Sequence, residues 1–164
     1  MGKSDYPMTR GARLLRSKMI AFVPHIYAYE AHGGTRHAAA CLSVNEHVVI
    51  KTLVMEPAGG KPLLVLMHGD REVSTKNLAR ALGVKSVTPC EMEKAERVTG
   101  YQVGGISPFG TRQPLRVYVE QSVLTLERIY INGGKRGFLV EIAPADLRKA
   151  FRVQEVEIAI VPEQ

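Results

Sequence analysis

Glycine and proline are concentrated in one short segment, residues 99–110, which has the sequence TGYQVGGISPFG. The adjacent pair Gly104-Gly105 permits backbone conformations that are closed to other residues and lets a ligand approach the main chain closely. Successive amides in such a turn can converge on a carbonyl oxygen or an anion. Pro108 fixes one dihedral angle and restricts Ser107 before it. The segment therefore predicts either a backbone binding site or an ordinary tight turn.

This glycine loop does not fit the standard motifs for a serine nucleophile or a phosphate-binding loop. A nucleophile elbow requires Gly-x-Ser-x-Gly, whereas GISPFG is one residue longer and places proline directly after the serine. A P-loop requires Gly-Lys-Ser/Thr, and neither Gly60-Lys61 nor Gly134-Lys135 continues in that way. We therefore expect the useful chemistry from backbone amides, which can form an oxyanion hole without supplying a nucleophile.

Lys51 is the charged side chain whose position most suggests chemistry, because it interrupts the apolar run VVIKTLV. Lysine is seldom fully buried, so this side chain must extend to solvent, pair with an acid or point into a cavity. At the rim of an apolar pocket, its ammonium can hold a carbonyl or phosphate oxygen as a point charge. The sequence leaves all three placements open.

The histidines and cysteines show no metal-binding pattern. The five histidines form neither an H-x-x-x-H pair nor an H-E-x-x-H motif, and Cys41 and Cys90 lie outside any CxxC spacing. We expect no metal, no other cofactor and no disulfide, as is typical of a reduced, cytoplasmic protein. Cys41 is expected to pack as a small apolar group, whereas Cys90 lies near the N-terminus of a predicted helix, which would lower the pKa of its thiol.

The composition is typical of one soluble and mildly basic domain. The 164 residues suit a single core, and no apolar run is long enough to span a membrane or to form a secretory signal. The formal net charge is +6, and basic side chains are frequent in residues 3–18. This charge favours a polyanionic partner such as nucleic acid, the alternative being a solvated cationic surface.

The elements that must position these residues alternate along the chain, which predicts a single α/β domain and not a regular doubly wound sheet. Helices are predicted at residues 9–19, 35–42, 74–82, 88–99 and 144–151, and strands at residues 22–29, 47–55, 63–67, 115–119, 128–131, 138–142 and 153–161. The strand with Lys51 is apolar on both parities and is expected to be central, while Pro24 indicates an edge strand. Residues 88–91 fit a capping box, and residues 132–134 fit a hairpin turn.

The combined motifs resemble one known family. TGYQVGGISPFG, followed by IYINGGKRGFLVEIAPADL at residues 129–147, is similar to the YbaK/EbsC family of aminoacyl-tRNA deacylases, which are stand-alone relatives of the editing domain of bacterial prolyl-tRNA synthetases. The segment FVPHIYAYE and the lysine in VIKTLV also match, so the resemblance covers nearly the whole chain. It implies an α/β (α+β) fold with a mixed, partly barrel-like sheet flanked by helices. Residues 9–164 would form the editing domain, after a flexible tail at residues 1–8.

The resemblance also implies a pocket beside the glycine loop. Lys51 would be the essential lysine of this pocket, and Gly104, Gly105 and Ile106 would place their amides near the scissile ester. The residues that the resemblance implies as substrate contacts are Tyr27, Thr52, Ser107, Pro108, Asn132 and Leu139. No side chain is implied as the nucleophile. In cysteine-clearing members the thiol of the substrate attacks its own carbonyl, and alanine-clearing members use water.

The function implied by the resemblance is that of a trans-editing hydrolase, with Cys-tRNA(Pro) as the first expected substrate. Asn132 and Leu139 stand where relatives carry serine and aspartate, so alanine or serine is an alternative amino acid. A non-catalytic module that binds tRNA or a synthetase is a second alternative. The expected partners are the acceptor end of tRNA and a prolyl-tRNA synthetase, without a membrane or a metal.

Overall fold

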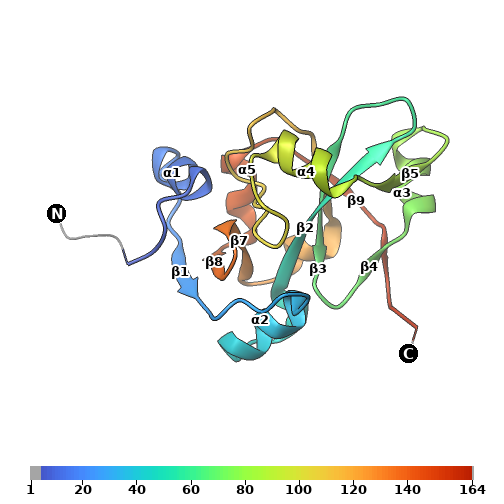
Figure 1. Ribbon diagram of the computed structural model, residues 1–164. Coiled ribbons are helices and arrows are strands. Elements are labelled where there is room, and N and C mark those ends of the chain that lie inside the picture. The colour runs from blue at the N-terminus through green and yellow to red at the C-terminus, as the bar shows by residue number, and fades with distance from the viewer. Residues whose placement is uncertain (1–4, 164) are drawn as a thin grey trace.

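The computed structural model describes residues 5–163, which form a large mixed sheet with helices packed around it (Figure 1). The strands are β1 (Val23–Ile26), β2 (Val49–Pro57), β3 (Leu63–His68), β4 (Glu72–Val73), β5 (Val87–Pro89), β6 (Val117–Glu120), β7 (Ile129–Lys135), β8 (Phe138–Ile142), β9 (Val153–Val156) and β10 (Ala159–Ile160). The helices are α1 (Arg10–Ser17), α2 (Gly34–Leu42), α3 (Thr75–Leu82), α4 (Met92–Thr99) and α5 (Leu147–Ala150). Short 3-10 helices are η1 (Glu46–Val48), η2 (Gln121–Thr125) and η3 (Pro144–Asp146).

The strand order of the large sheet is β1-β8-β7-β2-β3-β6-β9, and β5 also pairs with β2. The pairs β2–β3 and β7–β8 are antiparallel, whereas β2–β7, β3–β6 and β6–β9 are parallel. A separate two-stranded sheet joins β4 to β10. The expected single α/β domain with a mixed sheet flanked by helices is confirmed.

The core lies on both faces of β3, whose six residues are all buried. Leu64 and Leu66 belong to a cluster that includes side chains of α1, α4 and α5. Leu63 and Val65 belong to a second cluster, which includes side chains of α3. Because successive side chains of a strand point to opposite faces, β3 joins the two clusters across the sheet.

Three features that the sequence predicts from local chemistry are confirmed. The strand that contains Pro24 lies at the edge of the sheet, where it pairs with β8. The strand β2 is central, with β3 and β7 as its neighbours. The hydroxyl of Ser74 accepts a hydrogen bond from the Asn77 amide (3.1 Å) at the start of α3, and Gly83 ends this helix with φ +69°.

The capping box predicted at residues 88–91 is wrong. Val87–Pro89 form β5, which runs antiparallel to the end of β2, and the amide of Cys90 donates to the carbonyl of Val54 (2.9 Å). The helix α4 begins only at Met92 and has no side-chain cap. Pairing with β2 satisfies the backbone here, and such tertiary pairing outweighs a local preference for a helix start.

The hairpin turn predicted at residues 132–134 is also wrong, because β7 continues to Lys135. The register of β7 against β8 shifts between Asn132 and Lys135, which marks a β-bulge. The Oδ1 atom of Asn132 accepts hydrogen bonds from the amides of Gly134 (2.6 Å) and Lys135 (3.2 Å), so a side chain replaces part of the strand ladder. The chain reverses after Lys135, where Gly137 has φ +81°.

Both ends of the chain differ from the predicted boundaries. The predicted tail at residues 1–8 lies partly outside the described residues. Within the described part, the ring of Tyr6 packs against Phe22 and Phe138, with ring centroids 5.3 and 5.8 Å apart. Tyr6 therefore already contacts the core. The strand predicted at residues 153–161 is divided into β9 and β10, which belong to different sheets.

Candidate active site

A cavity of about 610 Å³ lies between α2, β2, α4 and the glycine loop. Seven of the ten residues that the sequence analysis assigns to the site line this cavity, namely Tyr27, Lys51, Thr52, Gly104, Ile106, Asn132 and Leu139. Gly105, Ser107 and Pro108 are not part of the lining. The remaining walls are mainly apolar and include Val49, Ile50, Leu53, Val54 and Ala95. The arrangement is a pocket with mainly apolar walls that also presents charged and polar side chains, as small-ligand sites do.

The side chain of Lys51 lies in the wall of the cavity, in the middle of β2. Its Nζ atom donates a long hydrogen bond to the carbonyl of Gly69 (3.5 Å). Burial lowers the pKa of Lys51 below its usual value, while the carboxylates of Glu46, Glu72 and Asp70 act in the opposite direction. Of the three placements that the sequence left open, the structure shows the one in a cavity.

The glycine loop makes a tight turn at the cavity wall. The amide of Gly105 donates to the carbonyl of Gln102 (2.8 Å), and Gly104 has φ +93° at the third position of this turn. A positive φ at that position is the reason for glycine there. The Gly105 amide is therefore occupied within the loop. The amides of Gly104 and Ile106 donate to no protein acceptor among residues 5–163, which leaves them available to a ligand.

Side chains from two other elements hold this turn in place. The carboxylate of Glu96, on α4, accepts a hydrogen bond from the Val103 amide (2.7 Å). Arg136 donates through Nε to the Val103 carbonyl (2.9 Å), and Asn132 donates through Nδ2 to the Gly104 carbonyl (3.3 Å). These contacts fix the peptide planes on either side of Gly104, so the free amide of Gly104 is oriented before a ligand binds.

Ser107 and Pro108 lie on the inner side of the loop. Both residues are buried, and the Ser107 hydroxyl accepts a hydrogen bond from the Phe109 amide (3.1 Å). Phe109 is itself fully buried in the main core cluster. This side of the loop anchors it to the core, while the opposite side carries Gly104 and Ile106 at the cavity.

Two residues of the cavity lining, Tyr27 and Thr52, carry hydroxyl groups. Burial raises the pKa of the Tyr27 phenol, so this group stays protonated at neutral pH. The Oγ1 atom of Thr52 is buried and has no hydrogen-bond partner within the described chain. An unpaired buried hydroxyl costs about 1 to 3 kcal/mol.

Cys90 also lines the cavity, but its thiol is not activated. Burial, and after it the carboxylate of Glu56, raises the pKa of Cys90, so the predicted lowering is wrong. The physical reason is that α4 begins only at Met92 and Cys90 sits in an extended segment after β5. A protonated thiol is a poor nucleophile at neutral pH.

Tyr29, His37 and Arg136 line the same cavity and were not predicted from the sequence. Arg136 belongs to the segment at residues 129–147 that resembles the known family, but no role was expected for it. A signal for Tyr29 was present, since this residue shares the parity of Tyr27 along the predicted strand. Among residues 5–163, no group of three or more histidine, cysteine, aspartate or glutamate side chains is arranged to hold a metal ion.

Comparison with known proteins identifies the family. The family model for the aminoacyl-tRNA editing domain matches residues 32–150. The chain belongs to this family. The resemblance seen in the sequence is therefore confirmed, and with it the class of ester hydrolase that acts on aminoacyl-tRNA.

Individual relatives of this editing domain cover most of the chain. "Putative Cys-tRNA(Pro)/Cys-tRNA(Cys) deacylase EbsC" of Enterococcus faecalis is 27% identical over 157 residues, which are 95% of this chain and 96% of the relative. A proline–tRNA ligase of Desulfotalea psychrophila is 32% identical over 111 residues, which are 66% of this chain and 19% of the ligase. A crystal structure of a "putative trans-editing enzyme for prolyl tRNA synthetase" has a TM-score of 0.79 at 20% identity and covers 94% of this chain and 99% of that one. The last match shows that the two proteins share a fold.

No helix of this editing domain within residues 5–163 has the length and apolar character that crossing a bilayer requires.

Proposed function

We propose that the protein is a trans-editing deacylase that hydrolyses the ester of a mischarged tRNA, with Cys-tRNA(Pro) as its first substrate. The observation that carries this proposal is that Lys51 and the residues with free amides, Gly104 and Ile106, line the same mainly apolar cavity. The similarity to EbsC supports the choice of amino acid and tRNA, because it extends over 95% of the chain.

Electrostatic stabilisation is the main contribution expected from the protein. When the ester carbonyl is attacked, negative charge develops on its oxygen, and the amides of Gly104 and Ile106 are placed to donate to it. One donor of this kind contributes about 3 to 4 kcal/mol to the stability of a transition state. The Lys51 ammonium holds the substrate in position as a point charge.

The nucleophile is expected to come from the substrate or from water, because the Cys90 thiol is protonated. With a cysteinyl ester, the substrate thiol attacks its own carbonyl carbon and a carbon–sulfur bond forms. The bond from this carbon to the ribose oxygen breaks, and the thiol proton is transferred to that oxygen. The tRNA leaves as an alcohol, and water later opens the thiolactone to cysteine. With an alanyl or seryl ester, water attacks the carbonyl instead.

Alanine or serine is the second candidate for the amino acid. The observation that favours it is Leu139, which is only 4% exposed and places an apolar side chain in the cavity wall. Such a wall gives a small apolar side chain a dry surface and offers no charge to the cysteine thiol.

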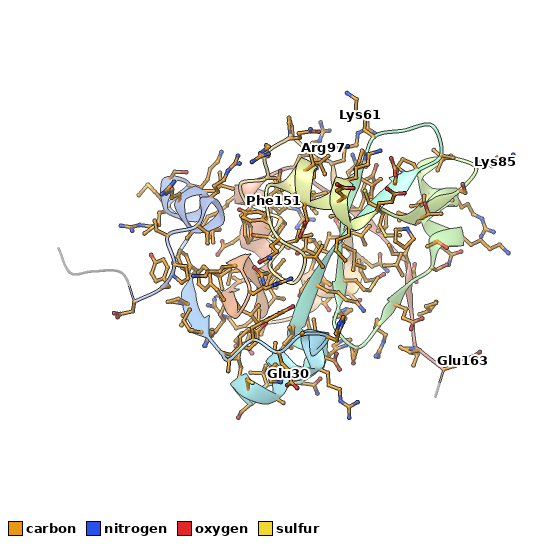
Figure 2. All side chains as sticks on the ribbon, in the orientation of Figure 1. Glu30, Lys61, Lys85, Arg97, Phe151 and Glu163 are labelled. Carbon is orange, nitrogen blue, oxygen red and sulfur yellow. The ribbon has the colours of Figure 1, made fainter. Side chains whose placement is uncertain are left out.

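The test is a panel of tRNAs charged with cysteine, alanine, serine or proline, incubated with the wild type and with Lys51→Ala. We expect the wild type to release one amino acid rapidly and Lys51→Ala to release it at the uncatalysed rate, with an unchanged circular dichroism spectrum. Lys61→Ala is the matched control, because Lys61 is an exposed lysine outside the cavity lining. Figure 2 shows it far from Glu30, which is one of the lining residues. Full activity of Lys51→Ala would overturn the role of Lys51, and binding without release would identify a non-catalytic module.

A further inference from the structure

Tyr29 and Arg136 form a layered pair at the cavity. The guanidinium carbon of Arg136 lies 5.0 Å from the centre of the Tyr29 ring. Both residues belong to the cavity lining, and both are exposed to solvent. They therefore form part of the mouth of the cavity and not its floor. Arg136 also helps to hold the glycine loop, but neither side chain takes part in the proposed deacylation step.

The pair is fixed in place by the backbone around it. The Nε atom of Arg136 donates to the carbonyl of Val103 (2.9 Å), and Gly137 accepts a hydrogen bond from the Tyr27 amide (2.9 Å). A side chain at Gly104 would meet the Tyr29 hydroxyl oxygen at 2.6 Å and the Arg136 Nε atom at 3.2 Å. Glycine at position 104 therefore allows the pair to lie directly on the loop. A preorganised surface of this kind loses little conformational entropy when a ligand binds.

The charge of Arg136 is not neutralised within the described chain. Among residues 5–163, its guanidinium forms no ion pair with a carboxylate, and its Nε atom is the one that binds the loop. The terminal nitrogens are left for a partner. Arginine binds phosphate through two parallel hydrogen bonds, and a flat pair of a guanidinium and a phenol ring offers a surface for stacking.

We propose that Tyr29 and Arg136 bind the terminal nucleotide of the RNA acceptor strand. The base stacks on the layered pair, and the phosphodiester on its 5′ side pairs with the guanidinium of Arg136. This inference rests on the proposed function, because the ester of an aminoacyl-tRNA is carried by the ribose of that nucleotide. Gly104 connects the two parts of the site, since it lines the cavity and also touches both members of the pair. An ester held at the loop amides thus leaves its nucleoside at the cavity mouth.

The experiment compares binding and turnover in variants of the full chain. The RNA trinucleotide CCA is titrated into each protein and followed by NMR, and kcat and KM are measured on the mischarged tRNA that the wild type cleaves. Tyr29→Leu removes the aromatic ring, Tyr29→Phe retains it, and Arg136→Lys retains the charge without the planar fork. Arg152→Ala is the matched control, because it removes one exposed positive charge outside the cavity lining.

For Tyr29→Leu and Arg136→Lys we expect KM to rise and CCA affinity to fall by about 5- to 100-fold, as loss of a base-stacking or phosphate contact predicts. The kcat of Tyr29→Leu should stay within about twofold, while Tyr29→Phe and Arg152→Ala should resemble the wild type. Unchanged KM and CCA affinity in both variants would overturn the proposal, as would a fall in kcat without a change in CCA affinity. If the wild type cleaves no tRNA, the proposed function fails. The CCA titration alone then tests whether Tyr29 and Arg136 bind a nucleotide. Loss of CCA binding in Tyr29→Leu would still support the nucleotide site, and a wild type that does not bind CCA would refute it.

Discussion

Lys51 carries a positive charge in a cavity wall that is mostly apolar, and this placement has a cost for stability. Burial lowers the pKa of Lys51, so the folded protein holds this proton less tightly than the unfolded chain does. At pH 7 Lys51 is protonated in both the folded and the unfolded state. The cost of holding this charge in a half-buried place therefore makes the folded state less stable. Removal of the charge at similar volume should therefore stabilise the fold, as is common for residues retained for activity.

We expect Lys51→Met to be more stable than the wild type by about 0.5 to 1 kcal/mol in urea unfolding at pH 7, and to lack deacylase activity. Lys61→Met is the control, since Lys61 is exposed in the β2–β3 turn and its charge is hydrated in both states. A Lys51→Met protein that is no more stable than Lys61→Met would contradict this account of the cavity.

The same pKa determines how activity depends on pH. Lys51 is charged below its pKa and neutral above it, and burial moves that pKa below the usual value of 10.5. If the ammonium holds the substrate, the part of kcat/KM that depends on Lys51 falls as the pH rises through the lowered pKa. The measurement is the deacylation rate from pH 6 upwards with the uncatalysed rate subtracted. Lys51→Arg keeps its charge over this range, so whatever activity it retains should not fall there. An identical fall in Lys51→Arg would assign the titration to another group.

At the scale of elements, the glycine loop combines two demands at one position. Gly104 needs a positive φ for its turn, and it also needs space for Tyr29. Gly59 has only the first of these requirements: its φ is +69°, but no atom lies within 4 Å of where a Cβ would be. We expect Gly59→Ala to cost about 1 kcal/mol, from backbone strain alone, and to retain full activity.

Gly104→Ala should cost more stability than Gly59→Ala, since the added methyl group must displace the Tyr29 hydroxyl. It should also lower kcat/KM at least tenfold, because the free amides shift with the turn. Thermal unfolding and steady-state deacylation of the two variants provide the comparison. Equal stabilities and equal activities would show that the loop tolerates a side chain and that its geometry is not critical.

Elements were predictable where the controlling interaction is local. Ser74 and Gly83 mark the ends of α3 through contacts within a few residues, and the sequence predicts this helix at residues 74–82. The segment around Pro89 was not predictable, because its backbone is satisfied by β2, which is distant in the chain. The turn near Asn132 was mispredicted although these contacts are local, because its carboxamide accepts from the amides of Gly134 and Lys135 and supports a bulge within β7 instead of a turn.

In the candidate site, too, the residues were predictable where the signal is local in the sequence and not where it depends on distant contacts. The unusual lysine at position 51 and the glycine loop stand out in the sequence, and the structure brings them to one cavity. Which side of the loop faces this cavity depends on how the turn is oriented, so Ser107 could not be assigned from its position alone. Tyr29 and Arg136 become a pair only when the segment after β1 packs against the β7–β8 turn, and the spacing of residues in the sequence does not reveal that contact.

At the scale of the whole molecule, the C-terminal segment closes the fold through one buried carboxylate. Glu120, at the end of β6, is only 3% exposed. Its Oε1 atom accepts hydrogen bonds from the amides of Ile158 (2.7 Å) and Ala159 (3.0 Å), and its Oε2 atom accepts one from the Ser122 hydroxyl (2.6 Å). The chain then continues into β10, which pairs with β4 just before α3. One side chain thus joins the large sheet to the small one.

Acid should weaken this closure once the Glu120 carboxylate takes up a proton. Burial acts to raise the pKa of Glu120, but the hydrogen bonds from Ser122, Ile158 and Ala159 outweigh it, and the pKa lies below the usual 4.5. A carboxyl group of this kind stabilises the protein above pH 4.5, and that stability is lost as the pH falls through its lowered pKa. Glu120→Gln should lower the free energy of unfolding at pH 7 by about 1 to 3 kcal/mol and make it less dependent on pH between 5 and 3. Urea unfolding across that range measures both effects, with the exposed Glu157→Gln as control. A Glu120→Gln protein that matches this control at every pH would show that the amides of the C-terminal segment are satisfied without the charge.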